Sequence, residues 1–167
     1  VGNMADLVDK DLTQPIESKA VLDAVPATLR DPGNQWVALS MRARVVYAAK
    51  DLELDAITYE QLADPAWKGK LCIRSGQHPY NTGLFAAYLA HHGVDATETW
   101  LTGLKANLAR KPGGGDRDGA KDILGGICDI AVANSYYVGL MRSNEKEPEQ
   151  KAWGEAIKVL LPTFEGG

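Results

Sequence analysis

Two adjacent tyrosines, Tyr136 and Tyr137, are the residues of this 167-residue chain whose types and spacing point most directly to chemistry. They follow a predicted buried strand that ends at Asn134, and they open a predicted helix. Neighbouring residues of a helix differ in direction by about 100°, so both phenols could face one cleft at the carboxyl end of the strand. Open α/β sheets bind their ligands at that end. The alternative is ordinary packing, with one tyrosine in the core and the other on the surface.

Phenolate oxygens are hard ligands, and the order of ligand softness makes ferric iron, Fe³⁺, their natural partner. A free phenol has a pKa of about 10, so binding at neutral pH must displace protons and must weaken as the pH falls. Tyr80, in a loop behind another predicted strand, could supply a third phenolate. Three phenolates would formally neutralise Fe³⁺. An added anion would then need a nearby cation, for which Arg42 or Arg44 is available.

Other chemistries find little support in the sequence. The three histidines are too few for a rich metal site, and His78, next to the third tyrosine, is ambiguous. No GxSxG, HExxH or CxxC motif occurs. The glycines at 113–115 lack the Lys-Ser/Thr of a phosphate-binding loop, so we interpret them as a mobile connector. Asp116 and Asp118 behind them are typical of a helix start.

The composition is that of a folded domain with no sign of a nucleic-acid or membrane partner. Hydrophobic residues make up 45% and charged residues 24% of the chain, close to globular averages. A net charge of −4 without a basic stripe argues against nucleic acid and anionic membranes as partners. No apolar run approaches the roughly 20 residues of a membrane-spanning helix, so we expect a chain that is not membrane-embedded.

The elements that must position these residues alternate between the two periodicities. Residues 1–34 are weakly patterned. Strands are predicted at 35–48, 70–74, 128–133 and 158–161, and helices at 81–92, 95–108, 116–124, 136–142 and 148–157. Gly93 is predicted to end the first helix. The alternation predicts an α/β lobe of three layers, with a central mixed, mainly parallel sheet flanked by helices.

Two cysteines, Cys72 and Cys128, allow either one disulfide or two free thiols. Both fall on predicted strands or their edges. Neighbouring strands would bring the sulfurs within bridging distance, but the sequence alone does not show that these strands are neighbours. Both alternatives therefore stay open at this point.

Several motifs, in order along residues 36–140, resemble those of the ferric-iron-binding proteins of bacterial ABC importers. They are WVALSMRARVVY at 36–47, LADPAWKGK at 62–70, PYNT at 79–82, GLKANLAR at 103–110, GGDRD at 114–118 and CDIAVANSYY at 128–137. The ordered set carries the resemblance more than any one motif does. It implies a periplasmic-binding-protein-like II fold in which two α/β lobes, joined by crossover strands, close over Fe³⁺. It also implies a periplasmic location and an ABC importer membrane permease as partner.

The resemblance implies roles for particular residues. In the family, paired tyrosines are iron ligands, and those positions match Tyr136 and Tyr137. A subgroup adds a tyrosine from the loop that holds Tyr80 here. Family members bind a synergistic anion such as carbonate or phosphate, and Asn134 and an arginine of the Arg-Ala-Arg run, preferably Arg42, are candidates to touch it.

The resemblance also bears on the cysteines and on the length of the chain. Some family members carry a disulfide between the strands where Cys72 and Cys128 lie, and an oxidising periplasm favours that bridge. Members are roughly twice this length and begin with a lobe that contributes a His, Tyr or Glu ligand. We therefore interpret residues 1–167 as a single α/β lobe, the second of two, cut from a longer protein whose N-terminal lobe is its partner. Whether His78 or Arg44 takes part in the site stays open.

Other functions stay open beside iron transport. The same fold could bind a small anion or a polyamine, with no iron role. A lobe that has lost binding is a further alternative. An enzyme that uses tyrosine as acid or base has only the permissiveness of the fold behind it, so we expect no catalysis.

Overall fold

The computed structural model describes residues 2–165, and the chain divides into two compact units, residues 1–41 and 42–167. The first unit contains two short helices, a 3-10 turn and one isolated bridge between Arg30 and Val37. These elements are α1 (Gly2–Asp9), α2 (Lys19–Ala24) and η1 (Ala27–Leu29). The candidate site residues all lie in the second unit. Whether the whole chain acts as one lobe stays a prediction.

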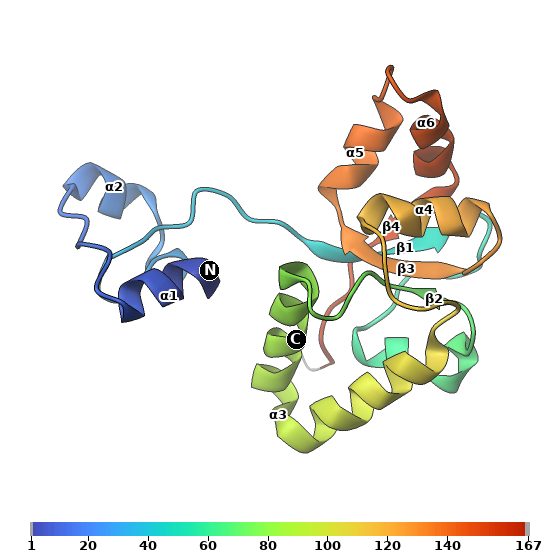
Figure 1. The fold of residues 1–167 in the computed structure, drawn as a ribbon, viewed down its shortest axis with the longest axis horizontal. Helices are drawn as coiled ribbons and strands as arrows, with labels where there is room; N and C mark the ends of the chain where they lie inside the picture. The colour runs from blue at the N-terminus through green and yellow to red at the C-terminus, as the bar shows by residue number, and fades with distance from the viewer. Residues whose placement is uncertain (1, 166–167) are drawn as a thin grey trace. The chain divides into compact units, whose positions relative to one another are not determined.

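A four-stranded sheet forms the centre of the second unit, in the order β2-β3-β1-β4 (Figure 1). The strands are β1 (Arg44–Ala49), β2 (Leu71–Cys72), β3 (Ile130–Asn134) and β4 (Ile157–Leu160). Strand β2 runs parallel to β3, whereas β1 is antiparallel to both β3 and β4. The mixed α/β sheet with flanking helices is confirmed, but the expectation of a mainly parallel sheet is wrong. Strand β1 is buried on both faces, and a continuous apolar run does not encode strand direction.

The sequence predicts a strand over residues 35–48, but the observed strand, β1, begins only at Arg44. β-Branched and aromatic residues show that a segment suits a pleated surface, but a strand also needs a neighbouring backbone. Within the described residues, only Val37 of the segment before β1 makes a bridge, and it does so outside the sheet.

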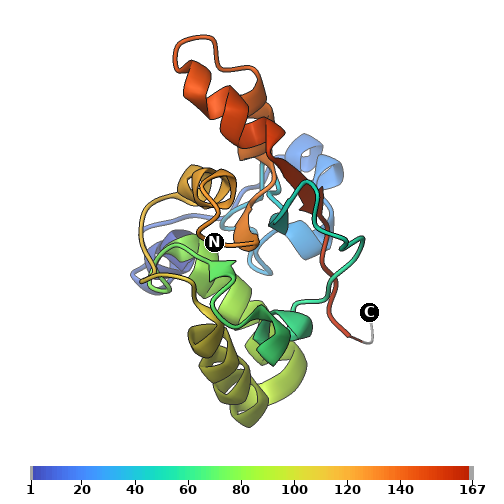
Figure 2. The ribbon, with the colours of Figure 1, turned by 90° about the vertical axis from the view of Figure 1, so that its right-hand side faces the viewer.

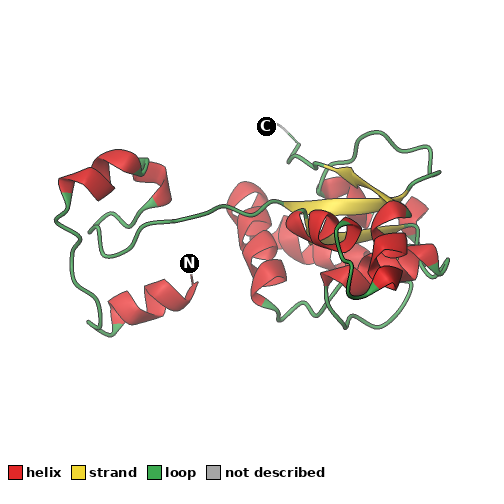
Figure 3. Cartoon of the chain, turned by 90° about the horizontal axis from the view of Figure 1, so that it is seen from above, coloured by secondary structure: helices red, strands yellow, loops and turns green. Residues whose placement is uncertain are grey.

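Helices cover the sheet on both faces, which gives the predicted three layers (Figures 1 and 2). One face packs on α3 (Pro79–Asn107) and η2 (Glu60–Ala63), and the other on α4 (Asp116–Leu124), α5 (Tyr136–Arg142) and α6 (Pro148–Glu155). Alternate residues of β1 divide between the two cores: Val46 contacts the α3 side, and Val45 and Tyr47 contact the α4 side. Figure 3 shows the strands and helices of this unit by colour.

Helix boundaries follow the capping signals of the sequence. The predicted helices 116–124 and 136–142 are confirmed as α4 and α5. Helix α3 bends at Gly93, whose φ of 79° and ψ of 179° are not helical, so the predicted break at this residue is also confirmed. The bend is visible as a V in Figure 1. Among the described residues, no helix is both long and apolar enough to cross a membrane.

The sheet topology brings two sequence-distant segments to one edge. Because β1 is antiparallel to β3, the first residue of β1, Arg44, pairs with the last residue of β3, Asn134. Helix α5 begins directly after that end of β3, and β2 ends on the same side because it is parallel to β3. This edge positions the candidate site.

Candidate functional site

The structure brings the three predicted tyrosines together. The hydroxyl oxygens of Tyr80, in the first turn of α3, and Tyr136, in the first turn of α5, are 3.2 Å apart. The rings of Tyr136 and Tyr137 are tilted against each other with centroids 4.3 Å apart. Two oxygens that each lie about 2 Å from one ion are at most about 4 Å apart, so one cation could contact both hydroxyl oxygens.

Each of these three phenol rings has a guanidinium within 6 Å of its centroid, the range of cation–π attraction. Two of the guanidiniums share the ring of Tyr80. The pairs are Arg42 with Tyr136 at 5.9 Å, Arg44 with Tyr80 at 5.8 Å, Arg74 with Tyr80 at 5.1 Å, and Arg117 with Tyr137 at 5.3 Å.

A buried carboxylate, Asp116, lies behind the tyrosines and holds two of these cations. Its side chain is fully buried, and it accepts hydrogen bonds from Arg44 Nη1 at 2.5 Å and from Arg74 Nη1 at 3.2 Å. It also accepts the backbone N–H of Asn134 at 2.7 Å. Two cations against one anion leave this buried network with a net positive charge beside the phenols.

The two candidate arginines differ in their surroundings. Arg44 has several hydrogen-bond partners: besides Asp116, it donates to the side chains of Asn134 at 3.2 Å and Asn81 at 2.7 Å. Asn81 in turn donates to two backbone carbonyls of the loop before α3. Arg42 is exposed and lies at the tyrosine cluster. Arg44 is therefore part of the buried framework of the site, whereas Arg42 lies at its exposed side.

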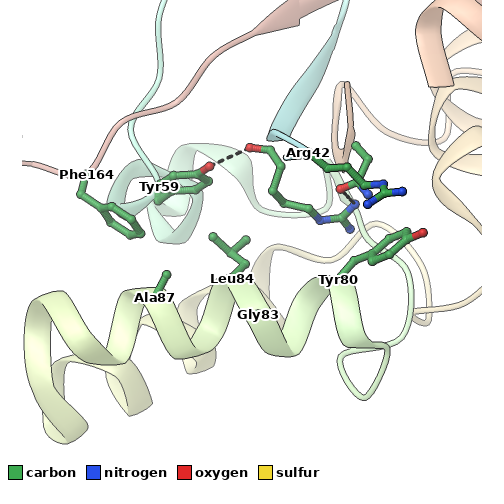
Figure 4. Close-up of a pocket in the computed structure, with 9 residues that line it drawn as sticks. Arg42, Tyr59, Tyr80, Gly83, Leu84, Ala87 and Phe164 are labelled. Carbon is green, nitrogen blue, oxygen red and sulfur yellow. Dashed lines mark hydrogen bonds between the residues drawn. The ribbon is translucent and has the colours of Figure 1, made fainter. Parts of the chain in front are cut away.

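A pocket of about 320 Å³ opens beside the cluster (Figure 4). Its polar end is formed by Arg42, Arg44, Asn134 and Tyr80, and its other end is mostly apolar. The remaining lining residues are Tyr59, Gly83, Leu84, Ala87 and Phe164. The predicted anion residues Arg42 and Asn134 thus share one pocket with Tyr80, and the tyrosine pair is not among its lining residues.

Hydrogen bonding and desolvation together raise the pKa of Tyr80. The hydrogen bond with Tyr136 and desolvation raise the pKa of Tyr80 above 10, and a hydrogen bond with Tyr137 and the charge of Arg42 oppose the rise. His78 lies beside this phenol, with its ring edge-on at 4.5 Å between centroids. Its Nδ1 accepts the backbone N–H of Tyr80 at 3.2 Å, so His78 caps α3.

Cys72 and Cys128 form a disulfide with Cα atoms 5.9 Å apart. The predicted bridge is therefore present in the structure. It joins the end of β2 to the segment before β3, within the core on the α4 side of the sheet. The bridge thus ties together the two parallel strands that lead toward the site.

The site also contains residues that the sequence did not single out, among them Asp116, Arg74 and Arg117. Asp116 was interpreted only as a charge at a helix start, and its burial was not foreseen. The available signal was its place directly behind a glycine run, because glycines allow a helix to begin close to a sheet. In the described residues 2–165, no group of three or more His, Cys, Asp or Glu side chains is arranged to hold a metal ion.

Comparison with known proteins identifies the family. The family profile described as "Bacterial extracellular solute-binding protein" matches residues 2–162. The iron uptake protein A2 of Synechocystis sp. is 38% identical over 159 residues, which cover 93% of this chain and 45% of that protein. The solved structure of the Bordetella ferric binding protein is 60% identical, with a TM-score of 0.94, and the match covers 100% of this chain and 53% of that one.

A further solved structure, the apo ferric ion-binding protein A of Pasteurella haemolytica, is 46% identical with a TM-score of 0.90. The match covers 99% of this chain and 52% of that one. The chain thus spans about half the length of these relatives. These names confirm the resemblance to ferric-binding proteins, and the family is one of solute-binding proteins rather than enzymes. The chain belongs to the bacterial extracellular solute-binding protein family.

Proposed function

We propose that this chain is a ferric-iron-binding lobe of the periplasmic substrate-binding protein of an iron ABC importer. Tyr80, Tyr136 and Tyr137 bind Fe³⁺ as phenolates, and Arg42 and Asn134 hold a synergistic anion such as carbonate or phosphate. The observation that carries the proposal is the 3.2 Å approach of the Tyr80 and Tyr136 hydroxyl oxygens from two separate helices. Hard oxygen donors in this number suit a small, highly charged cation.

The local charge supports a synergistic anion. Four guanidiniums surround the three phenols, and Asp116 supplies one negative charge, which leaves three net positive charges. Three phenolates would cancel these charges, and Fe³⁺ would then restore a charge of three. An anion beside Arg42 reduces that excess, and charge-assisted hydrogen bonds to a guanidinium are among the strong ones.

The relatives and the disulfide support the cargo and the location. The similar proteins are named for iron uptake or ferric binding, and they are about twice the length of this chain. A second lobe of a longer protein would then complete the iron coordination and bring the loaded carrier to its membrane permease. A disulfide such as Cys72–Cys128 persists in oxidising compartments, of which the periplasm is one.

The test replaces the tyrosine pair. We expect the ferric affinity of the Tyr136→Phe, Tyr137→Phe double variant, measured by competition with nitrilotriacetate, to fall by more than about 100-fold, which exceeds the usual cost of losing an outer-shell partner. Tyr88→Phe is the matched control, because Tyr88 is a buried core tyrosine of α3 outside the cluster, and it should bind as wild type does. Unchanged affinity in the double variant would contradict the iron assignment.

A second cargo, a small anion without iron, is favoured by one observation. The pocket beside Tyr80 has Arg42, Arg44 and Asn134 at its polar end, and the network around it is positive. This charge also disfavours a polyamine. If phosphate binds to the chain with the same affinity in the presence and absence of Fe³⁺, and Fe³⁺ itself does not bind, the second cargo replaces the first.

A further inference from the structure

We infer that Asp116 is a positioning residue for the tyrosine cluster and that the first turn of α4 is the element that orients all three phenols. The inference concerns how the proposed iron site is built, so its iron readout rests on the proposed function. Its geometric content, the orientation of the phenol rings, does not. None of the three tyrosines is itself a residue of α4.

Asp116 acts on Tyr80 through two arginines. Its two carboxylate oxygens are divided between them: Oδ2 accepts from Arg44 and Oδ1 from Arg74. Both guanidiniums face the ring of the same phenol, with centroid distances of 5.8 Å and 5.1 Å. One buried anion therefore fixes the two cations against which the ring of Tyr80 packs.

Asp116 also acts on the tyrosine pair through the backbone. Its Oδ2 accepts the N–H of Asn134, the last residue of β3, two positions before Tyr136. The next residue of α4, Arg117, faces the ring of Tyr137 at 5.3 Å and donates to the buried Gln150 of α6 at 3.1 Å. Two consecutive residues of α4 thus reach the surroundings of all three phenols.

The turn that presents Asp116 is itself tightly held. Asp118 Oδ2 accepts the backbone N–H of Gly115 at 2.6 Å. Gly114 has a φ of 68°, and a Cβ on it would lie 2.7 Å from the same oxygen, so a larger residue there would be strained. A Cβ on Gly119 would lie 2.8 Å from Ala131 Cβ, which shows that α4 packs closely on β3. The end of the glycine run is therefore a turn that Asp118 holds at the entry to α4, and its interpretation as a mobile connector stays a prediction.

Loss of the carboxylate should release the rings. Without Asp116, Arg44 and Arg74 would be two largely buried cations that repel each other, and the buried Nε of each is already without a hydrogen-bond partner in the described structure. Breaking a buried ion pair by removing one partner is costly because the remaining charge is uncompensated. The guanidiniums would move toward solvent, and Tyr80 would lose the surface on which its ring lies.

The experiment compares Asp116→Asn with Asp122→Asn in the whole chain. Asp122 is the matched control, because it lies on the same helix as Asp116 and pairs with Arg110, at 2.5 Å, away from the tyrosines. The first readout is metal-free NMR of ring-labelled tyrosine. We expect Asp116→Asn to shift the Tyr80 ring resonances and to weaken the ring contact between Tyr80 and Tyr136, and we expect Asp122→Asn to leave both unchanged.

The second readout is ferric binding from ferric nitrilotriacetate, which we expect to weaken by about 10- to 100-fold in Asp116→Asn, the usual cost of an outer-shell partner. If Asp116→Asn fails to fold, Arg74→Lys tests the same arrangement of Asp116, arginine and the Tyr80 ring. This variant keeps the charge beside Asp116 and removes the planar guanidinium from the ring of Tyr80. The same ring shifts are expected there.

Identical tyrosine NMR spectra for wild type and the folded variant would overturn the inference, whatever the ferric affinity of the variant. If the Tyr80 ring resonances shift in Asp116→Asn but the wild-type chain binds no Fe³⁺, the positioning role is supported and the proposed function is refuted. Shifted rings with unchanged ferric affinity would overturn the claim that this positioning serves the iron site.

Discussion

Replacing Tyr80 with phenylalanine should change the number of protons that the chain releases when it binds Fe³⁺. At pH 7 the removal of a proton from a phenol of pKa about 10 costs about 4 kcal/mol. The hydrogen bond to Tyr136 and desolvation raise the pKa of Tyr80, so its proton costs more. If all three phenols bind, each Fe³⁺ displaces three protons. If Tyr80 is absent, it displaces two.

The sign of the pH dependence follows from this count. As the pH falls, the phenols hold their protons more firmly, so the ferric affinity must fall too. Three released protons change the binding free energy by about 4 kcal/mol per pH unit, and two change it by about 3 kcal/mol. The Tyr80→Phe variant should therefore show the shallower dependence on pH.

Isothermal titration calorimetry in two buffers of different ionisation enthalpy measures the count directly. Ferric nitrilotriacetate is the titrant, and the protons taken up by the released chelator are measured separately and subtracted. Tyr88→Phe, which removes a core phenol, should release the same number of protons as wild type. An equal count in wild type and Tyr80→Phe would refute the assignment of Tyr80 as a ligand.

Two predictions concern stability. Reducing the Cys72–Cys128 disulfide, whose cysteines are 56 positions apart, should lower the free energy of unfolding by about 4 kcal/mol, because the unfolded chain regains the entropy of that loop. Urea unfolding with and without reductant measures this difference. Coincident unfolding curves would contradict it. Gly103→Ala should cost about 1–3 kcal/mol, because its Cβ would lie 2.7 Å from Ala63 Cβ. A Cβ on Gly83, in the same helix, would have no atom within 4 Å, so Gly83→Ala should instead raise the free energy of unfolding by about 0.5–1 kcal/mol. Equal shifts of the melting temperature in the two variants would show that the contact between residues 103 and 63 is absent.

Local signals in the sequence predict the helices well. The bounds of α4 and α5 and the break at Gly93 match the structure, because capping residues and glycines act within a few positions of themselves. The meeting of the three tyrosines at one edge of the sheet could also be predicted, because each follows a predicted strand directly or lies in the loop behind one. Position along the chain then implies position at the sheet edge.

Strand direction and the charge network could not be predicted in this way. The apolar residues of β1 record burial on both faces, which is the same for parallel and antiparallel neighbours. The meeting of Arg44, Arg74 and Asp116 joins residues up to 72 positions apart. It depends on the order β2-β3-β1, which no local pattern contains.

The choice between Arg42 and Arg44 illustrates the same limit. The two residues are nearly identical in the sequence, two positions apart and on one face of the expected strand. The structure separates them, because Arg44 begins β1 and reaches the buried Asp116, whereas Arg42 precedes the strand and is exposed. Assignment of the anion to Arg42 is now a proposal with a structural reason behind it.

The measurement that tests the central claim most directly is the visible absorption spectrum of the chain during titration with ferric nitrilotriacetate. Iron bound by phenolates absorbs visible light through charge transfer from ligand to metal. We predict a visible band that saturates at one Fe³⁺ per chain and is lost in the Tyr136→Phe, Tyr137→Phe variant. A chain that binds Fe³⁺ without a visible band, or a band that survives in that variant, would contradict the tyrosinate site.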